Sequence, residues 1–186
     1  RLTGLMRTLV EVEVASVEEQ LFGEFNNSIP LPAIIAVVEV APLSGTMIFQ
    51  MSASVVYGII SRLFGGMADY IDASKPFSDI DIAITETILP QCLAIFNTSW
   101  EKVAKLNART QRIETSPQFT QVVPANEPSA IITLNVHMDE VEDIIAICMP
   151  HFMIQPIAKK LNSMTWTLAG RDKLPQETVP IMRHRL

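Results

Sequence analysis

The sequence predicts an α/β fold in which two related halves share one sheet and helices pack on that sheet. Three observations support this prediction. The chain has 186 residues, 48% of them hydrophobic, which suits one domain with a sizeable core. Short hydrophobic runs typical of strands alternate with longer stretches of helical periodicity. An internal repeat places the same succession of hairpin and helix in both halves.

The repeat becomes visible when the sequence is shifted by about 98 positions. Segment 38–63 then falls on segment 136–161 without a gap. Met47-Ile48-Phe49 meets Ile145-Ala146-Ile147, and Leu63 meets Leu161. Because each copy reads as a hairpin followed by a helix, the two halves are expected to be related by a pseudo-two-fold axis.

The N-terminal segment is expected to be largely helical. Hydrophobic spacing over residues 2–26 is mostly that of a helix, although the alternation at 10–14 also suits a strand. Ser16 followed by Glu19 forms a capping-box pattern, which predicts a second helix beginning at Val17. Two prolines then end that helix.

The remaining elements are hydrophobic runs separated by turn residues. Ser78 and Asp81 mark the start of a long amphipathic helix, which Pro90 is expected to bend. In order, the expected elements are strand 34–40, turn 42–45, strand 46–51, helix 54–64, helix 79–105, strand 111–123, strand 130–138, acidic turn 139–143, strand 144–149 and helix 152–161.

Charge and cysteine content argue against several functional classes. A net charge of −6 disfavours nucleic acid as a ligand, because phosphate binding needs a basic face. The uncharged run between Glu39 and Arg62 is interrupted by turn residues and polar side chains, so no membrane insertion is expected. Cys92 and Cys148 lack metal or redox spacing and are expected to be buried free thiols of a cytoplasmic protein.

Catalytic and metal-binding motifs are absent from the sequence. His137 and Asp139 lie close to Glu140, Glu142 and Asp143, a grouping that could suit a hard metal ion, but the spacing and glycine of a calcium-binding loop are missing. A solvated acidic turn is the favoured interpretation. We therefore expect no metal and no cofactor.

Gly65-Gly66 marks a loop after the predicted helix 54–64. One glycine suffices to end a helix, because it adopts the left-handed conformation without steric cost. The second glycine leads into Met67, Ala68 and Tyr70, which place a thioether and an aromatic ring beside a flexible backbone. A simple helix stop and a partner-binding loop both explain the pair.

An ordered set of motifs resembles the middle domain of the FliM family of flagellar motor switch proteins. The set holds from residue 2 to residue 161. It consists of Leu63-Phe64-Gly65-Gly66, Phe77-Ser78 entering a long helix, Arg112-Ile113-Glu114 and Ser116-Pro117-Gln118-Phe119, with Pro42-Leu43-Ser44-Gly45, Cys148-Met149-Pro150 and Ile154-Gln155-Pro156-Ile157 in support.

The resemblance implies a three-layer α/β/α fold of the CheC type over residues 1–164 and a linker over 165–186. It implies a non-enzymatic, structural role in the cytoplasmic switch ring at the flagellar basal body, where the chemotaxis signal sets the rotation direction. The implied partners are FliG, neighbouring FliM copies, phosphorylated CheY through a missing N-terminal peptide, and FliN through a missing C-terminal SpoA-like domain.

The resemblance also implies where FliG binds. The family's GGxG loop corresponds to residues 65–68, with alanine in place of the last glycine. Aromatic and thioether side chains would anchor the partner, and charged side chains would lie at the rim. The expected FliG-binding residues are Gly65, Gly66, Met67 and Ala68, flanked by Arg62, Phe64, Asp69 and Tyr70.

The related CheC and FliY phosphatases, which act on phosphorylated CheY, are the alternative. They carry an acidic or serine residue followed by ExxN on one face of a long helix, where the side chains position a water molecule. The matching positions of this sequence are Ile82, Glu86 and Leu89, and in the first half Glu18 and Leu21. Leucine cannot orient a water molecule, so we expect no phosphatase activity.

Overall fold

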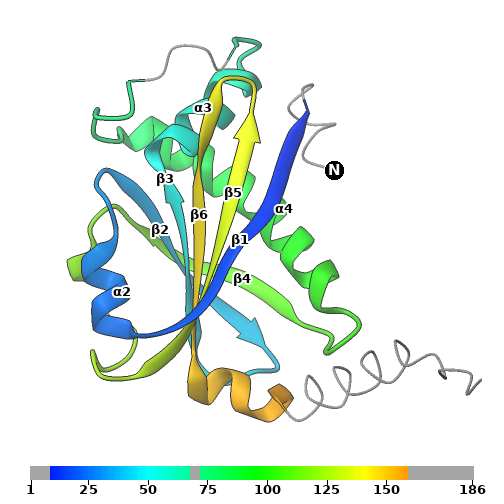
Figure 1. Cartoon of the computed structure of the whole chain (residues 1–186). Helices are drawn as coiled ribbons and strands as arrows, with labels where there is room; N and C mark the ends of the chain where they lie inside the picture. Colours follow the sequence, from blue (N-terminus) through cyan, green and yellow to red (C-terminus); the bar gives the residue numbers. More distant parts are fainter. Residues whose placement is uncertain (1–8, 68–71, 159–186) are drawn as a thin grey trace, which may run out of the picture.

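The computed structural model describes residues 9–67 and 72–158, which fold around a sheet of six strands (Figure 1). The strands are β1 (Val10–Leu21), β2 (Ala33–Ala41), β3 (Thr46–Ser52), β4 (Asn107–Glu114), β5 (Pro128–Met138) and β6 (Val141–Pro150). They are ordered β1-β5-β6-β3-β2-β4, and every neighbouring pair is antiparallel.

The helices lie on both faces of this sheet. They are α2 (Phe22–Ser28), α3 (Ala53–Leu63) and α4 (Asp79–Trp100), with a 3-10 turn at Pro117–Phe119 and a further helix at 151–158. Within the part of the chain that the structure describes, no helix combines the length and apolar character needed to cross a lipid bilayer.

A pseudo-two-fold axis passes between the central strands β3 and β6. Phe49 of β3 lies opposite Ile147 of β6, and these are two residues that the internal repeat superimposes. A bulge skips Ala15 in β1, and a second bulge skips Gln111 at the equivalent place in β4. The predicted symmetry is therefore confirmed down to the irregularities of the outer strands.

The gapless alignment of the repeat is wrong at one point. The turn between β2 and β3 spans residues 42–45, whereas β5 and β6 are joined by Asp139 and Glu140 alone. The second hairpin is therefore shorter, and the equivalent residues of β2 and β5 are displaced from the gapless match. Glu142 and Asp143, predicted to belong to an acidic turn, lie in β6.

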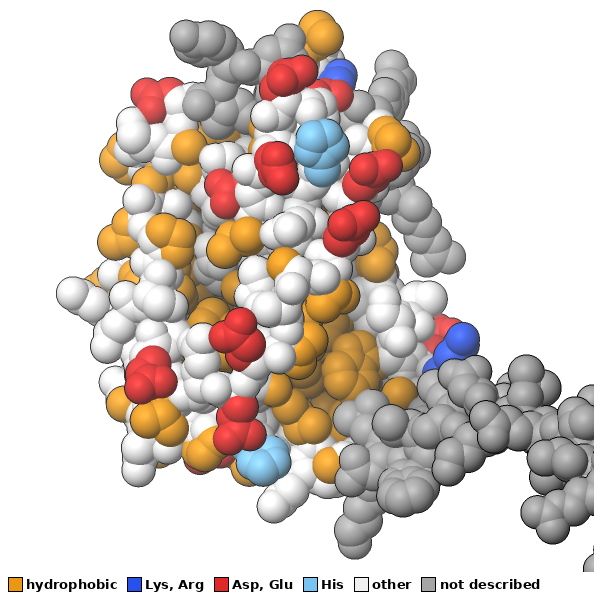
Figure 2. Space-filling model, viewed as in Figure 1, with side chains coloured by type: hydrophobic (Ala, Val, Ile, Leu, Met, Phe, Trp, Pro, Cys, Tyr) orange, Lys and Arg blue, Asp and Glu red, His pale blue; other side chains and the backbone are white. Residues whose placement is uncertain are grey.

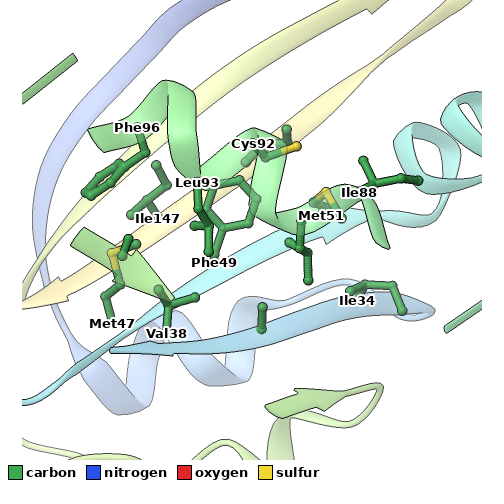
Figure 3. Packing of buried hydrophobic residues seen from close by; sticks show 14 of the residues in the cluster. Ile34, Val38, Met47, Phe49, Met51, Ile88, Cys92, Leu93, Phe96 and Ile147 are labelled. Carbon is green, nitrogen blue, oxygen red and sulfur yellow. The ribbon is translucent and has the colours of Figure 1, made fainter. Parts of the chain in front are cut away.

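The larger hydrophobic core lies between the sheet and the helices α3, α4 and 151–158. Figure 3 shows Ile88, Cys92, Leu93 and Phe96 of α4 lying over the side chains of the central strands. A second core lies on the opposite face of the sheet, where α2 buries Phe22 and Phe25. These two cores produce the α/β/α layering.

The long helix α4 begins where the sequence predicted. The Asp81 N–H donates to the Ser78 hydroxyl at 3.3 Å, and the Ser78 N–H donates to the Asp81 carboxylate at 2.8 Å. This reciprocal pair satisfies two helix N–H groups. Pro90 lies on the exposed side of α4, where water can bond the carbonyl that proline leaves unpaired. The helix ends at Trp100 rather than at residue 105.

The helix expected to begin at Val17 begins only at Phe22, as α2, and ends before the two prolines as predicted. Residues 10–21 form the edge strand β1, which confirms the strand alternative for residues 10–14 and shows that the helical prediction for residues 17–21 is wrong. This strand pairs with β5 from one end to the other. Pairing with β5 therefore decides the structure of this segment, although its hydrophobic spacing suits a helix. Ser16 and Glu19 lie within the strand, so their capping-box pattern starts no helix. Strand β4 also differs from the prediction, since it begins at Asn107 and ends at Glu114, before Pro117.

An open apolar groove lies between β1 and α4. Its walls include Val12 and Val14 of β1 and Ile95 and Trp100 of α4. Figure 2 shows a hollow lined by hydrophobic side chains in this region. The pseudo-two-fold axis relates β4, against which α4 packs, to β1. Among the described residues, no helix packs along β1 as extensively as α4 packs along β4.

Candidate partner-binding site

The helix α3 ends where the predicted loop begins. The Phe64 N–H donates to the Ile60 carbonyl at 3.2 Å, and the Gly65 N–H donates to the Arg62 carbonyl at 3.0 Å. Gly65 then adopts a φ of 79°, the left-handed conformation in which many helices end. The predicted helix stop is confirmed.

The two glycines of the loop are required for different reasons. At Gly65 a Cβ atom would meet nothing within 4 Å, so its positive φ is the feature that favours glycine. At Gly66 a Cβ atom would lie 2.7 Å from the Ser61 hydroxyl oxygen and 3.2 Å from the Ser61 carbonyl oxygen. Gly66 therefore lets the loop approach the last turn of α3 closely.

Ser61 and Arg62 hold the loop against α3. The Gly66 N–H donates to the Ser61 carbonyl at 2.9 Å, and the Ser61 hydroxyl donates to the Met67 carbonyl at 3.0 Å. The Arg62 guanidinium donates to the Gly66 carbonyl at 3.4 Å. The backbone of residues 65–67 is thus fixed by side chains and carbonyls of the preceding helical turn.

The braced loop displays large apolar side chains to solvent. Phe64 is 73% exposed and Met67 is 67% exposed. Side chains of this kind, held on a fixed backbone, are typical anchors of protein–protein interfaces. The geometry therefore suits binding to a protein partner.

Arg62 was expected to lie at the charged rim of the FliG contact, but in the structure it pairs with another residue of the same chain. Its guanidinium Nε and Nη2 atoms contact the carboxylate of Asp139, in the turn between β5 and β6. The two side chains are only 17% and 15% exposed. The charge of Arg62 is directed into the molecule, toward the second half of the sheet.

The structure leaves part of the predicted site undescribed and adds two residues that the sequence did not identify. Ala68, Asp69 and Tyr70 lie outside the described residues. Ser61 and Asp139 contact the loop or its brace and were not identified from the sequence. Ser61 directly precedes the motif, but Asp139 is 77 positions from Arg62 and only the fold brings the two together.

The acidic turn shows no metal-binding geometry. Glu11, His137 and Glu142 lie opposite one another on β1, β5 and β6 and form a row across the sheet. Figure 2 shows acidic and histidine side chains gathered on this face. Within residues 9–67 and 72–158, no three His, Cys, Asp or Glu side chains could hold a metal ion.

The positions that match the phosphatase motif do not gather on one exposed face. Leu89 is fully buried in the core and Ile82 packs against that core, whereas Glu86 is exposed. Glu18 and Leu21 lie on strand β1, so their assignment to a helix was wrong. These residues cannot jointly position a water molecule.

The two cysteines are buried free thiols, as predicted. Burial raises the pKa of Cys92 to about 11 and the pKa of Cys148 to about 12, where a hydrogen bond with Ser129 acts in the opposite direction. Both groups are therefore protonated at neutral pH and are unsuited to act as nucleophiles.

Sequence comparison identifies relatives over the whole chain. The family model "Flagellar motor switch protein FliM" matches residues 1–166. FliM of Treponema pallidum is 34% identical over 185 residues, which are 100% of this chain and 54% of that protein. The chain spans about half the length of the curated relatives that it matches.

Solved structures match the fold as well. A chain in the crystal structure of the FliG–FliM complex from H. pylori has a TM-score of 0.80 and 30% identity, covering 85% of this chain and 87% of that one. The FliM middle domain from H. pylori has a TM-score of 0.76 and 29% identity, covering 86% of each chain. The structural similarity therefore extends over most of the chain.

Proposed function

This chain belongs to the FliM family of flagellar motor switch proteins, and we propose that it is a structural part of the switch that binds FliG. The braced loop at residues 64–67 is the observation that carries the proposal. It displays two large apolar side chains on a backbone fixed by the end of α3. The likeness to a chain of the FliG–FliM complex from H. pylori supports FliG as the partner.

The proposed contact places Phe64 and Met67 in apolar pockets of FliG. Gly65 and Gly66 would let the FliG surface approach the loop backbone, since neither carries a side chain. Ala68, Asp69 and Tyr70 would continue the contact. Binding energy at protein interfaces is concentrated in a few such anchors, so Phe64 is expected to contribute most.

Family membership also supports the wider setting of this contact. We place residues 1–164 as the middle domain of a longer protein and residues 165–186 as its linker toward a SpoA-like domain that binds FliN. Neighbouring FliM copies would pack beside this domain at the cytoplasmic face of the flagellar basal body. Phosphorylated CheY would bias rotation by binding one arrangement of the switch better than the other.

The proposed role is non-enzymatic. The positions that a CheY phosphatase would use for catalysis hold Ile82 and Leu89, and Leu89 lies in the core while Ile82 packs against it. Phosphorylated CheY mixed with this protein should therefore lose its phosphoryl group at the rate of its own hydrolysis. A faster loss, measured by the recovery of unphosphorylated CheY, would show that the domain is a phosphatase.

The FliG contact can be tested by calorimetric titration of the protein with the middle region of FliG. Phe64→Ala should weaken binding by at least about tenfold, because it removes an exposed anchor. Phe119→Ala is the matched control, since Phe119 is 66% exposed but lies on the 3-10 turn after β4. That variant should bind FliG as tightly as wild type.

A second variant tests the loop backbone. Gly66→Asp places a side chain against Ser61 and should abolish binding. Urea unfolding of each variant shows whether the fold is intact. Equal affinity of wild type, Phe64→Ala and Gly66→Asp would show that the loop is not the FliG contact, and no binding by folded wild type would refute the proposed function.

A further inference from the structure

The ion pair between Arg62 and Asp139 joins two distant parts of the chain. Arg62 lies in the last turn of α3, and Asp139 begins the turn between β5 and β6. Two guanidinium nitrogens of Arg62 contact the same carboxylate oxygen, Oδ2 of Asp139. Because both side chains are largely buried, the pair is shielded from the screening that weakens surface ion pairs.

The same guanidinium also contacts the loop. Its third nitrogen, Nη1, donates to the Gly66 carbonyl at 3.4 Å. The position of the Arg62 side chain thus depends on the Asp139 carboxylate, and one contact of the loop backbone depends on Arg62. A continuous chain of contacts runs from the β5–β6 turn to the loop at residues 64–67.

The backbone of Asp139 accepts glycine as well as aspartate. Its φ is 53°, in the left-handed region that glycine, asparagine and aspartate adopt more readily than other residues. Each of these residues is common at the first position of a two-residue turn. The turn alone therefore does not require the carboxylate, and a glycine at this position would keep the turn but lose the contact with Arg62.

We propose that Asp139 is a positioning residue for partner binding, which acts through Arg62 to hold the loop at residues 64–67 in its binding conformation. This inference rests on the proposed function of that loop. The β5–β6 turn would then affect FliG binding indirectly, through the position of Arg62, and Asp139 itself need not contact FliG. Without the carboxylate, the Arg62 guanidinium loses the contact that fixes two of its nitrogens, and its bond to the Gly66 carbonyl weakens.

The variant Asp139→Gly separates positioning from turn formation. Glycine suits a φ of 53°, so the β5–β6 turn itself should be retained while the carboxylate is lost. In calorimetric titration with the middle region of FliG, this variant should bind on the order of tenfold more weakly than wild type. Glu140→Gln is the matched control, because Glu140 is the exposed neighbour in the same turn.

A second readout examines the loop without any partner. The Gly66 N–H, bonded to the Ser61 carbonyl, should exchange with solvent about tenfold faster in Asp139→Gly. Amides in the central strands β3 and β6 should exchange as in wild type. Faster exchange over the whole sheet would instead mean that Asp139 only stabilises the fold.

A double variant tests whether Asp139 acts through Arg62. If it does, Arg62→Ala combined with Asp139→Gly should bind FliG no more weakly than Arg62→Ala alone. Additive losses would overturn the inference, as would wild-type affinity and wild-type Gly66 exchange in Asp139→Gly. If wild type does not bind FliG, the proposed function fails, whereas the exchange measurement still decides whether Asp139 positions the loop.

Discussion

Gly65 and Gly66 stand next to each other, yet a side chain is unfavourable at each for a different reason. Gly65 has open space around it and a φ of 79°, so its constraint is conformational. Gly66 faces Ser61 at close range, so its constraint is steric. The motif is therefore a helix stop followed by a close backbone approach, which explains why one glycine is not enough.

Substituting Gly65 should cost stability in proportion to the left-handed strain. Gly65→Ala is expected to lower the free energy of unfolding by about 1–2 kcal/mol, because alanine resists a positive φ. Gly65→Asn should lose less, since asparagine tolerates this conformation. Urea denaturation of the two variants beside wild type measures the difference, and equal losses would mean that φ is not the cause.

The two edge strands, β1 and β4, carry features that hinder pairing with a strand of another molecule. In β4 the Ala108 N–H donates to the Asn97 side-chain oxygen of α4 at 2.9 Å, so this N–H is not available to a strand of another molecule. In β1 the edge carries exposed glutamates, Glu11 and Glu13 among them. Both devices discourage pairing with a foreign strand. The bulges at the equivalent places in β1 and β4 interrupt the outer ladders further.

The helix expected over residues 17–21, which lie in β1, was wrong for a reason at the scale of the element. Its hydrophobic spacing suits a helix over part of its length, and local propensity does not decide between the two structures. Pairing with β5 decides it, and that partner lies more than a hundred positions away in the chain. The helix α4, by contrast, carries its own start signal at Ser78, and its start was predicted correctly.

The molecule as a whole is organised around the axis between β3 and β6. Phe49 and Ile147 face each other there, and Phe49 lies in the core beneath α4 (Figure 3). Each half alone would leave one edge of the inner strand of its hairpin unpaired, so the two halves depend on this junction. Stability should therefore be sensitive to the packing of these two side chains.

Truncation at the axis should destabilise the whole fold. Phe49→Ala is expected to lower the free energy of unfolding by about 3–5 kcal/mol, because it leaves a cavity in the core. Phe119→Ala, at an exposed site, should stay within about 0.5 kcal/mol of wild type. Urea denaturation compares the two, and a small loss at Phe49 would mean that the core collapses around the gap.

The amino-acid sequence alone was enough to predict the α/β class, the internal symmetry, most helices and strands, and the glycine loop after α3. These features depend on local signals, namely hydrophobic period, capping residues and turn residues. The edge strand β1 and the Arg62–Asp139 pair could not be read in this way. Both depend on contacts between residues far apart in the chain, and such contacts exist only once the sheet has brought its two halves together.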